Sequence, residues 1–140
     1  MKVVLDTNIL GSALIKAGKP RNLFNKLVKD KQLVLSREIL KEFLEVIENP
    51  KIAKYTSEKD LAIFLKTLKS AARIVQVKSK FKAVKEDPDD DTIIRAAYDS
   101  KSNYIVSGDK HLLSLGEYRE IRIVNVDEML RLLKDESTAN

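Results

Sequence analysis

The stretch Val3-Val4-Leu5-Asp6-Thr7-Asn8 joins a short run of β-favouring apolar residues directly to an acid. In a later stretch, Tyr104-Ile105-Val106-Ser107-Gly108-Asp109, an acid follows a similar apolar run after two residues. Both apolar runs are continuous rather than alternating, which is typical of strands covered on both faces in a parallel sheet. In such sheets, ligands bind beyond the carboxyl ends of the strands. We therefore expect Asp6 and Asp109 to lie at one edge of the sheet.

Three further runs are predicted to be strands, at residues 33–35, 74–77 and 121–126. Helical patterns separate the strands, and Ser36 and Ser57 stand where each can cap a helix start. Strands alternating with helices favour an α/β fold with a central parallel sheet. The two successive helices between the second and third strands are an irregularity in this pattern.

The composition is that of one globular domain. The chain has 140 residues, of which 44% are hydrophobic, and chains of about 100–200 residues usually build one core. We expect this domain to span residues 1–134, with a polar, frayed tail over 135–140. The absence of cysteine excludes a disulfide-stapled secreted module, a thiol nucleophile and thiolate metal sites.

The same sequence has no apolar run near the roughly 20 residues of a membrane span, and its start lacks an export signal. We therefore expect a cytoplasmic protein without a membrane partner. Its 26 basic and 21 acidic residues give a net charge of +5, which permits an anionic partner.

Two other regions bring acids towards the same edge. Asp87, Asp89, Asp90 and Asp91 precede the apolar residues of a predicted helix, whose start in a βα unit tends to lie there. Glu42 falls at the margin of the apolar arc of the helix that begins after Ser36, so we expect it to be the inward carboxylate of that helix.

Carboxylates gathered in this way repel one another, and burying them without a counter-charge costs several kcal/mol. A divalent cation resolves the conflict, and all-oxygen ligation favours Mg²⁺ or Mn²⁺ over zinc. Two such ions about 3.5–4 Å apart can activate water and stabilise the leaving oxygen of a phosphodiester. Each acid also has a structural reading, because Asp after a strand is a common turn former or helix cap.

Four motifs, in order, resemble the PIN-domain nuclease family over nearly the whole chain. They are Leu5-Asp6-Thr7-Asn8, the inward Glu42, the acidic helix start followed by Ile93-Ile94, and Val106-Ser107-Gly108-Asp109. The third and fourth are similar to those of VapC-like toxins of type II toxin–antitoxin pairs. The resemblance implies a Rossmann-like α/β/α sandwich and Mg²⁺- or Mn²⁺-dependent endoribonuclease activity.

Carried over position by position, the resemblance implies that Asp6, Glu42 and Asp109 are metal-site acids. The third acid of the family matches Asp91, and Asp90 stays open as the alternative. Ser107 matches a position usually held by Thr or Ser, where its hydroxyl can orient a ligand or water. Asn8 matches a polar position beside the first acid.

A basic stretch of four lysines precedes the acidic helix start, and we expect it to hold RNA phosphates: Lys78, Lys80, Lys82 and Lys85. The alternative is a solvated charged loop. Two alternatives to a toxin also stay open, namely a catalytically silent RNA- or protein-binding scaffold and a housekeeping RNA-processing nuclease. Expected partners are RNA, a small antitoxin protein and a second copy of the chain. The apolar helices between Ser36 and Ala72 can supply the docking surface for either protein, and the alternative is that they belong to the core.

Overall fold

A computed structural model describes residues 1–82 and 88–139, except for the side chains of residues 88–89 and 137–139. Within this part of the chain, six strands form one sheet in the order β3-β2-β1-β4-β6-β5. The strands are β1 (Val3–Leu5), β2 (Leu33–Ser36), β3 (Arg73–Val75), β4 (Tyr104–Val106), β5 (Glu117–Tyr118) and β6 (Ile121–Val124). All pair in parallel except β5, which is antiparallel to β6.

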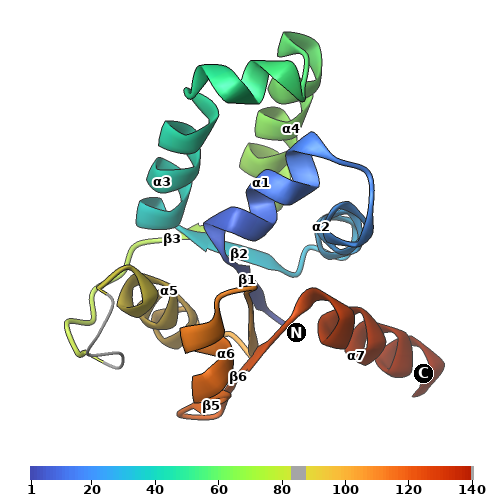
Figure 1. The fold of residues 1–140 in the computed structure, drawn as a ribbon. Helices are drawn as coiled ribbons and strands as arrows, with labels where there is room; N and C mark the ends of the chain where they lie inside the picture. Colours follow the sequence, from blue (N-terminus) through green and yellow to red (C-terminus); the bar gives the residue numbers. More distant parts are fainter. Residues whose placement is uncertain (83–87, 140) are drawn as a thin grey trace.

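Helices cover both faces of the sheet, which confirms the predicted α/β fold. On one face lie α1 (Thr7–Ile15), α2 (Lys19–Lys29), α3 (Arg37–Ile47) and α4 (Glu58–Ala71), and on the other α5 (Pro88–Asp99) and α6 (Lys110–Leu115) (Figure 1). A short 3-10 helix, η1 (Pro50–Lys54), links α3 to α4, and α7 (Val126–Ala139) packs beside α2. None of these described helices has the length and apolar character needed to cross a membrane.

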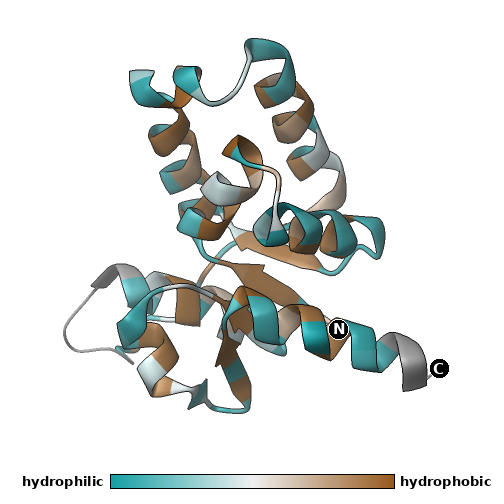
Figure 2. Cartoon of the chain, turned by 45° about the vertical axis from the view of Figure 1, so that its right-hand side comes forward, coloured by the Kyte–Doolittle hydropathy of each residue, from teal (hydrophilic) through white to brown (hydrophobic). Residues whose placement is uncertain are grey.

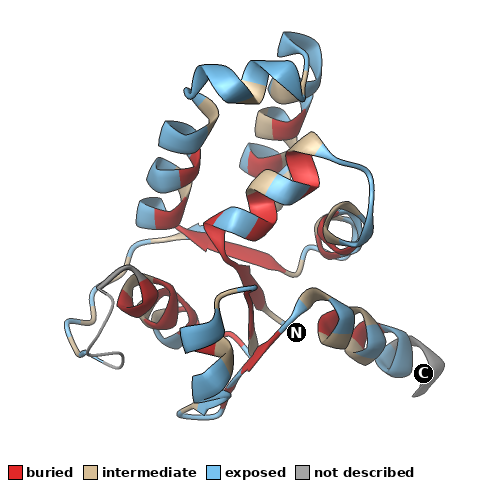
Figure 3. Cartoon of the chain, in the orientation of Figure 1, coloured by how far each residue is buried: buried red, intermediate tan, exposed pale blue. Residues whose placement is uncertain are grey.

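The continuous apolar strands form the centre of the core. Every residue of β1, β2 and the last two positions of β4 is buried, and the central strands are accordingly red in Figure 3 and brown in Figure 2. Their burial on both faces explains why they read as unbroken apolar runs.

Both predicted serine caps are confirmed. The Ser36 hydroxyl accepts the backbone N–H of Ile39 at 3.0 Å, and the Ser57 hydroxyl accepts that of Asp60 at 3.1 Å. Each bond satisfies one of the amide groups that a helix start leaves without an intrahelical acceptor. The first cap sets the start of α3 directly after β2, at the carboxyl edge of the sheet.

The structure differs from the sequence-based elements mainly at their ends. The last strand, expected over residues 121–126, stops at Val124 because the Asn125 side chain accepts the N–H of Glu128 at 2.8 Å and so begins α7. That helix continues to Ala139, through the segment expected to fray. The two-residue strand β5 and helix α1 were not predicted from the sequence.

The strand order creates a switch point between β1 and β4. From β1 the chain proceeds outward to β2 and β3, then crosses to β4 on the opposite side of β1. Leu5 and Val106 are register partners, so Asp6 and Ser107 leave the sheet side by side. Crevices at such switch points are the usual ligand sites of open α/β sheets.

Candidate functional site

Asp6 occupies the switch point with its backbone and its side chain. Its N–H donates to the Val106 carbonyl at 3.0 Å, which extends the β1–β4 ladder by one bond. Its own carbonyl accepts the N–H groups of Ile9 and Leu10, which starts α1. Asp6 stands at the cap position of α1, where the amide groups of Thr7 and Asn8 face its carboxylate without a regular capping bond. Only 9% of the residue is exposed, so this carboxylate is buried at the start of the helix.

Ser107 connects the two acids that the sequence placed at this edge. Its buried hydroxyl donates to Oδ2 of Asp6 at 2.8 Å and accepts the backbone N–H of Asp109 at 3.0 Å. The Asp109 carboxylate in turn accepts the N–H groups of His111 and Leu112 at 2.8 and 3.3 Å, which caps α6. The structural reading of Asp109 as a helix cap therefore holds, and it fixes the carboxylate beside Asp6.

Electrostatics around Asp6 favour a positive counter-charge. Burial raises the pKa of its carboxyl above the ordinary value, and the negative charge of Asp109 adds to the rise. The Ser107 hydroxyl and the amide groups of Thr7 and Asn8 act in the opposite direction without cancelling it. An ionised carboxylate held here stores unfavourable free energy that a bound cation would relieve.

Asp90 and Asp91 lie in the first turn of α5, which packs against β1 and β4. Their exposed fractions are only 5% and 3%, and both take part in interactions within the chain. Burial therefore does not separate the two candidates for the third acid. Both are placed where the positive end of the α5 dipole favours a carboxylate. Asp87 lies outside the described residues, and so does the side chain of Asp89.

Glu42 and Asn8 are exposed. Glu42 lies on α3, about 9 Å along the helix axis from the cap at Ser36, and it also takes part in an interaction within the chain. Its exposure is like that of Glu38 and Glu45 on the same helix, so the expected inward orientation is not visible as burial. Asn8 stands in the first turn of α1, at the surface beside Asp6.

The basic stretch lies at some distance from the acids. The backbone N–H of Lys78 donates to Asp99, the last residue of α5, at 2.6 Å. Asp99 is about 12 Å along the helix axis from Asp91. Lys80 and Lys82 follow on the same exposed segment, and Lys85 lies outside the described residues.

The residues at the switch point fit a hard divalent cation by their chemistry. Asp6 and Asp109 supply neighbouring carboxylate oxygens, and the buried Oγ1 of Thr7 has no hydrogen-bond partner among the described residues. Among those same residues, no three His, Asp or Glu side chains stand close enough together to hold one ion. The fit is therefore one of donor type and of two neighbouring acids, not of a preformed cage. Thr7 was not predicted from the sequence as a site residue.

Comparison with protein families identifies the family to which this chain belongs. The family model of the PIN domain matches residues 2–111, which span every element from β1 to the start of α6. The chain belongs to the PIN-domain family. The uncharacterized protein MJ1680 of Methanocaldococcus jannaschii is similar to this PIN domain, with 35% identity over 130 residues that cover 90% of this chain and 83% of that protein.

Solved structures show the same fold. VapBC2 from Rickettsia felis, bound to a DNA fragment from its promoter, matches this PIN domain with a TM-score of 0.62 and 20% identity, covering 89% of this chain and 98% of that one. PAE2754 from Pyrobaculum aerophilum matches with a TM-score of 0.56 and 13% identity, covering 96% and 90%. The predicted membership of the PIN-domain family is confirmed by the family model, and the solved structures confirm the fold.

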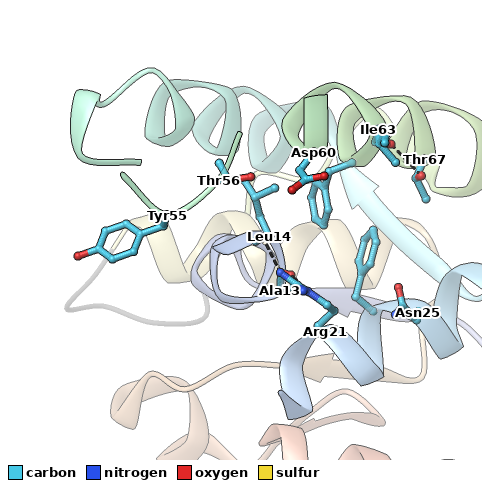
Figure 4. A pocket seen from close by; sticks show the side chains of 11 residues that line it. Ala13, Leu14, Arg21, Asn25, Tyr55, Thr56, Asp60, Ile63 and Thr67 are labelled. Carbon is cyan, nitrogen blue, oxygen red and sulfur yellow. Dashed lines mark hydrogen bonds between the residues drawn. The ribbon is translucent and has the colours of Figure 1, made fainter. Parts of the chain in front are cut away.

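A hollow of about 290 Å³ lies apart from the acids, between α1, α2 and α4 (Figure 4). Its floor includes the stacked rings of Phe24 and Phe64, whose centroids are 4.5 Å apart. At its rim, Arg21 donates to the carbonyls of Ala13 and Leu14 at 2.8 and 2.9 Å and so closes the end of α1. None of the site residues predicted from the sequence lines this hollow.

Proposed function

We propose that this PIN domain is a metal-dependent endoribonuclease that hydrolyses RNA phosphodiesters and acts as the toxin of a toxin–antitoxin pair. The observation that carries the proposal is the pair of neighbouring acids, Asp6 and Asp109, at the switch point of the sheet, where the Ser107 hydroxyl donates to the Asp6 carboxylate and accepts the backbone N–H of Asp109. A binding scaffold has no need of a buried carboxylate whose pKa is raised by burial and by a second acid.

In this proposal Asp6, Asp109 and either Asp90 or Asp91 hold Mg²⁺ or Mn²⁺, and Glu42 completes the set or orients a water. When bound, the cation supplies the positive charge that stabilises the phosphodiester transition state and favours deprotonation of the attacking water. The chain's own residues hold that arrangement in place. Ser107 orients the Asp6 carboxylate, and the start of α6 orients that of Asp109.

Cleavage of a defined RNA, with and without Mg²⁺ or Mn²⁺, tests this proposal. The wild-type chain should cut only with metal, and a chelator should stop the reaction. Asp6→Asn should lower the rate at least about 100-fold, since mutating even a residue that only hydrogen-bonds to a metal ligand costs about 10–100-fold. Asp30→Asn, which changes an exposed acid at the end of α2 by the same chemistry, is the matched control and should keep the wild-type rate.

Metal-independent cutting, or an undiminished rate in pure Asp6→Asn, would contradict the proposal. A chain that binds RNA without cutting it under any of these conditions would instead be a scaffold.

The toxin role rests on the fold shared with VapBC2, which the solved structure shows as a complex on promoter DNA. Exposed apolar side chains between Ser36 and Ala72 support a protein partner, and we propose a small antitoxin there. Tyr55 is 63% exposed and Ile63 55%, and both line the hollow between α1, α2 and α4. Expression of the chain alone should arrest growth, and co-expression of a small neighbouring reading frame should restore it. Growth without arrest would favour a housekeeping nuclease.

A further inference from the structure

Residues 76–82, all of them described, follow β3 without belonging to a helix or strand, yet their exposure alternates strictly. Val77, Ser79 and Phe81 are half-buried, whereas the three lysines between and after them are exposed. Alternation with a period of two is typical of extended chain, in which every second side chain points the same way. Lys78, Lys80 and Lys82 therefore form a row with a spacing of about 6.6 Å. We call this row the basic ridge.

The first anchor of the basic ridge is Asp99, at the end of α5. Its carboxylate accepts the backbone N–H of Lys78 at 2.6 Å, the N–H of Ser79 at 2.9 Å and the Ser79 hydroxyl. Partial burial opposes ionisation of Asp99, but these hydrogen bonds outweigh it and hold its pKa below the ordinary value. One carboxylate thus fixes two successive residues of the segment.

The second anchor is Phe81. Its carbonyl accepts from Nε of Arg95 at 2.7 Å, and its ring packs edge-on against Tyr98 and stacks on Tyr118, with centroid distances of 5.3 and 5.5 Å. The guanidinium of Arg119 lies 5.2 Å from the centroid of each of these three rings. Such cation–π contacts are attractive at this distance.

Arg119 also holds a disfavoured backbone in place. It and Glu120 both have positive φ, +46° and +71°, in the turn between β5 and β6. Residues with a Cβ rarely adopt this conformation, and turns of this kind normally use Gly or Asn. The three ring contacts of Arg119 therefore tie a strained hairpin to the segment that carries the lysines.

The two anchors hold the basic ridge against the last turns of α5. Ser79 contacts Asp99, the last residue of that helix, and Phe81 contacts Tyr98 and the side chain of Arg95. The lysines between and beside these anchors are therefore fixed in place on the surface near the end of α5.

A solvated loop needs none of these contacts, and fixing three neighbouring lysines brings like charges together. That arrangement favours a ligand with regularly spaced negative charges. We propose that the basic ridge binds successive phosphates of single-stranded RNA. Tyr98, 41% exposed beside the ridge, offers a ring on which a base can stack. An extended row matches one strand, whereas an RNA duplex presents its phosphates on a wide helical surface. The choice of RNA as the ligand rests on the proposed nuclease function.

Binding of a labelled single-stranded RNA in chelator tests the basic ridge without requiring cleavage. The triple variant Lys78→Gln, Lys80→Gln, Lys82→Gln should weaken binding at least 10-fold. The slope of log K against log salt should fall by about 2, because each phosphate contact to a single strand contributes about 0.7. The control triple Lys59→Gln, Lys66→Gln, Lys69→Gln, on exposed positions of α4, removes the same charge and should keep the wild-type slope.

Asp99→Asn separates anchoring from net charge. The substitution makes the chain more positive, so simple electrostatics predicts tighter RNA binding, whereas loss of the anchor predicts weaker binding. Ser79→Ala, which changes no charge, should weaken binding in the same direction. Unfolding curves check that each variant is folded, and Ser79→Ala serves if Asp99→Asn is not.

Equal losses in both lysine triples, tighter binding by Asp99→Asn, or stronger competition by duplex than by single-stranded RNA would each overturn the basic ridge. So would unchanged RNA binding together with lost binding of an acidic protein partner. A chain that binds single strands through the ridge but does not cut them would keep the ridge and overturn the nuclease. RNA cleavage by the variant Lys78→Gln, Lys80→Gln, Lys82→Gln with an unchanged KM would keep the proposed nuclease function and overturn the basic ridge.

Discussion

At the scale of single residues, the small side chain of Ser107 contacts both acids of the switch point. Its hydroxyl is both donor to Asp6 and acceptor from the Asp109 backbone, across 101 residues of sequence in the first case. The resemblance to PIN domains assigned it a hydroxyl that orients a ligand or water. The structure shows that the same hydroxyl orients the first acid, which no local pattern could reveal because the contact is tertiary.

Ser107→Ala should therefore cost both stability and cleavage. Removing the hydroxyl leaves the partly buried Asp109 N–H without that acceptor and the buried Asp6 carboxylate without that donor, a loss of about 1–3 kcal/mol. Urea unfolding measures the stability, and the RNA cleavage rate measures the second effect. Ser107→Thr keeps the hydroxyl and should lose less of the rate than Ser107→Ala. Equal rates in the two variants would remove Ser107 from the site.

Asp99 gives a pH dependence that is independent of the proposed metal site. Its pKa in the folded chain lies below the ordinary value, so its anchoring contribution is present above the ordinary pKa of 3.8 and is lost as the pH falls through the lower, folded value. Wild type should therefore be more stable than Asp99→Asn at pH 7, and the difference should shrink at pH 3. Urea unfolding of both chains at the two pH values measures it, and a difference that grows in acid would contradict the assignment.

At the scale of elements, the helix starts that carry a serine cap were predictable, whereas the start of α1 and the end of β6 were not. Ser36 and Ser57 each predict the start of a helix, because a hydroxyl cap is a local interaction with a residue three positions along the chain. The end of β6 depends on Asn125, whose side chain caps the start of α7, so the strand ends at Val124, two residues before its expected end. The strand β5 was missed because two residues carry no periodicity and its turn uses Arg119 and Glu120 in place of Gly or Asn.

The two serine caps offer a matched pair of variants. Ser36 is fully buried beside the start of α3, whereas Ser57 is exposed at the start of α4. Losing the cap leaves the Ile39 N–H buried without that acceptor, while water replaces the hydroxyl at Asp60. We expect Ser36→Ala to cost about 2 kcal/mol and Ser57→Ala about 1 kcal/mol or less. Unfolding of both variants in urea ranks them, and the reverse order would mean that burial does not set the value of a cap here.

At the scale of the whole molecule, charge is separated along α5. The buried acids Asp90 and Asp91 stand at its start, and the segment with Lys78 is anchored at its end. The net charge of +5 gave no hint of this arrangement. The shared edge of Asp6 and Asp109 was predictable because parallel strands end at one edge. The position of the lysines was not, because it depends on Asp99 and on the rings around Phe81, which lie far along the chain.

The neighbouring acids Asp6 and Asp109 at the switch point predict that a bound cation stabilises the folded chain as a whole. A ligand that binds only the folded state raises the free energy of unfolding by about 2.7 kcal/mol at 100 times its Kd, so saturating Mn²⁺ should raise the Tm of wild type by several degrees. Asp6→Asn should lose most of this rise, because it removes the buried carboxylate at the switch point. It should also melt higher than wild type in chelator, because the charge held beside Asp109 is gone. The rise should persist in Asp30→Asn, whose altered side chain is exposed at the end of α2. An equal Mn²⁺ effect on the Tm of wild type and of Asp6→Asn would place the cation elsewhere, since Asp6→Asn, unlike Asp30→Asn, alters the carboxylate that Ser107 orients.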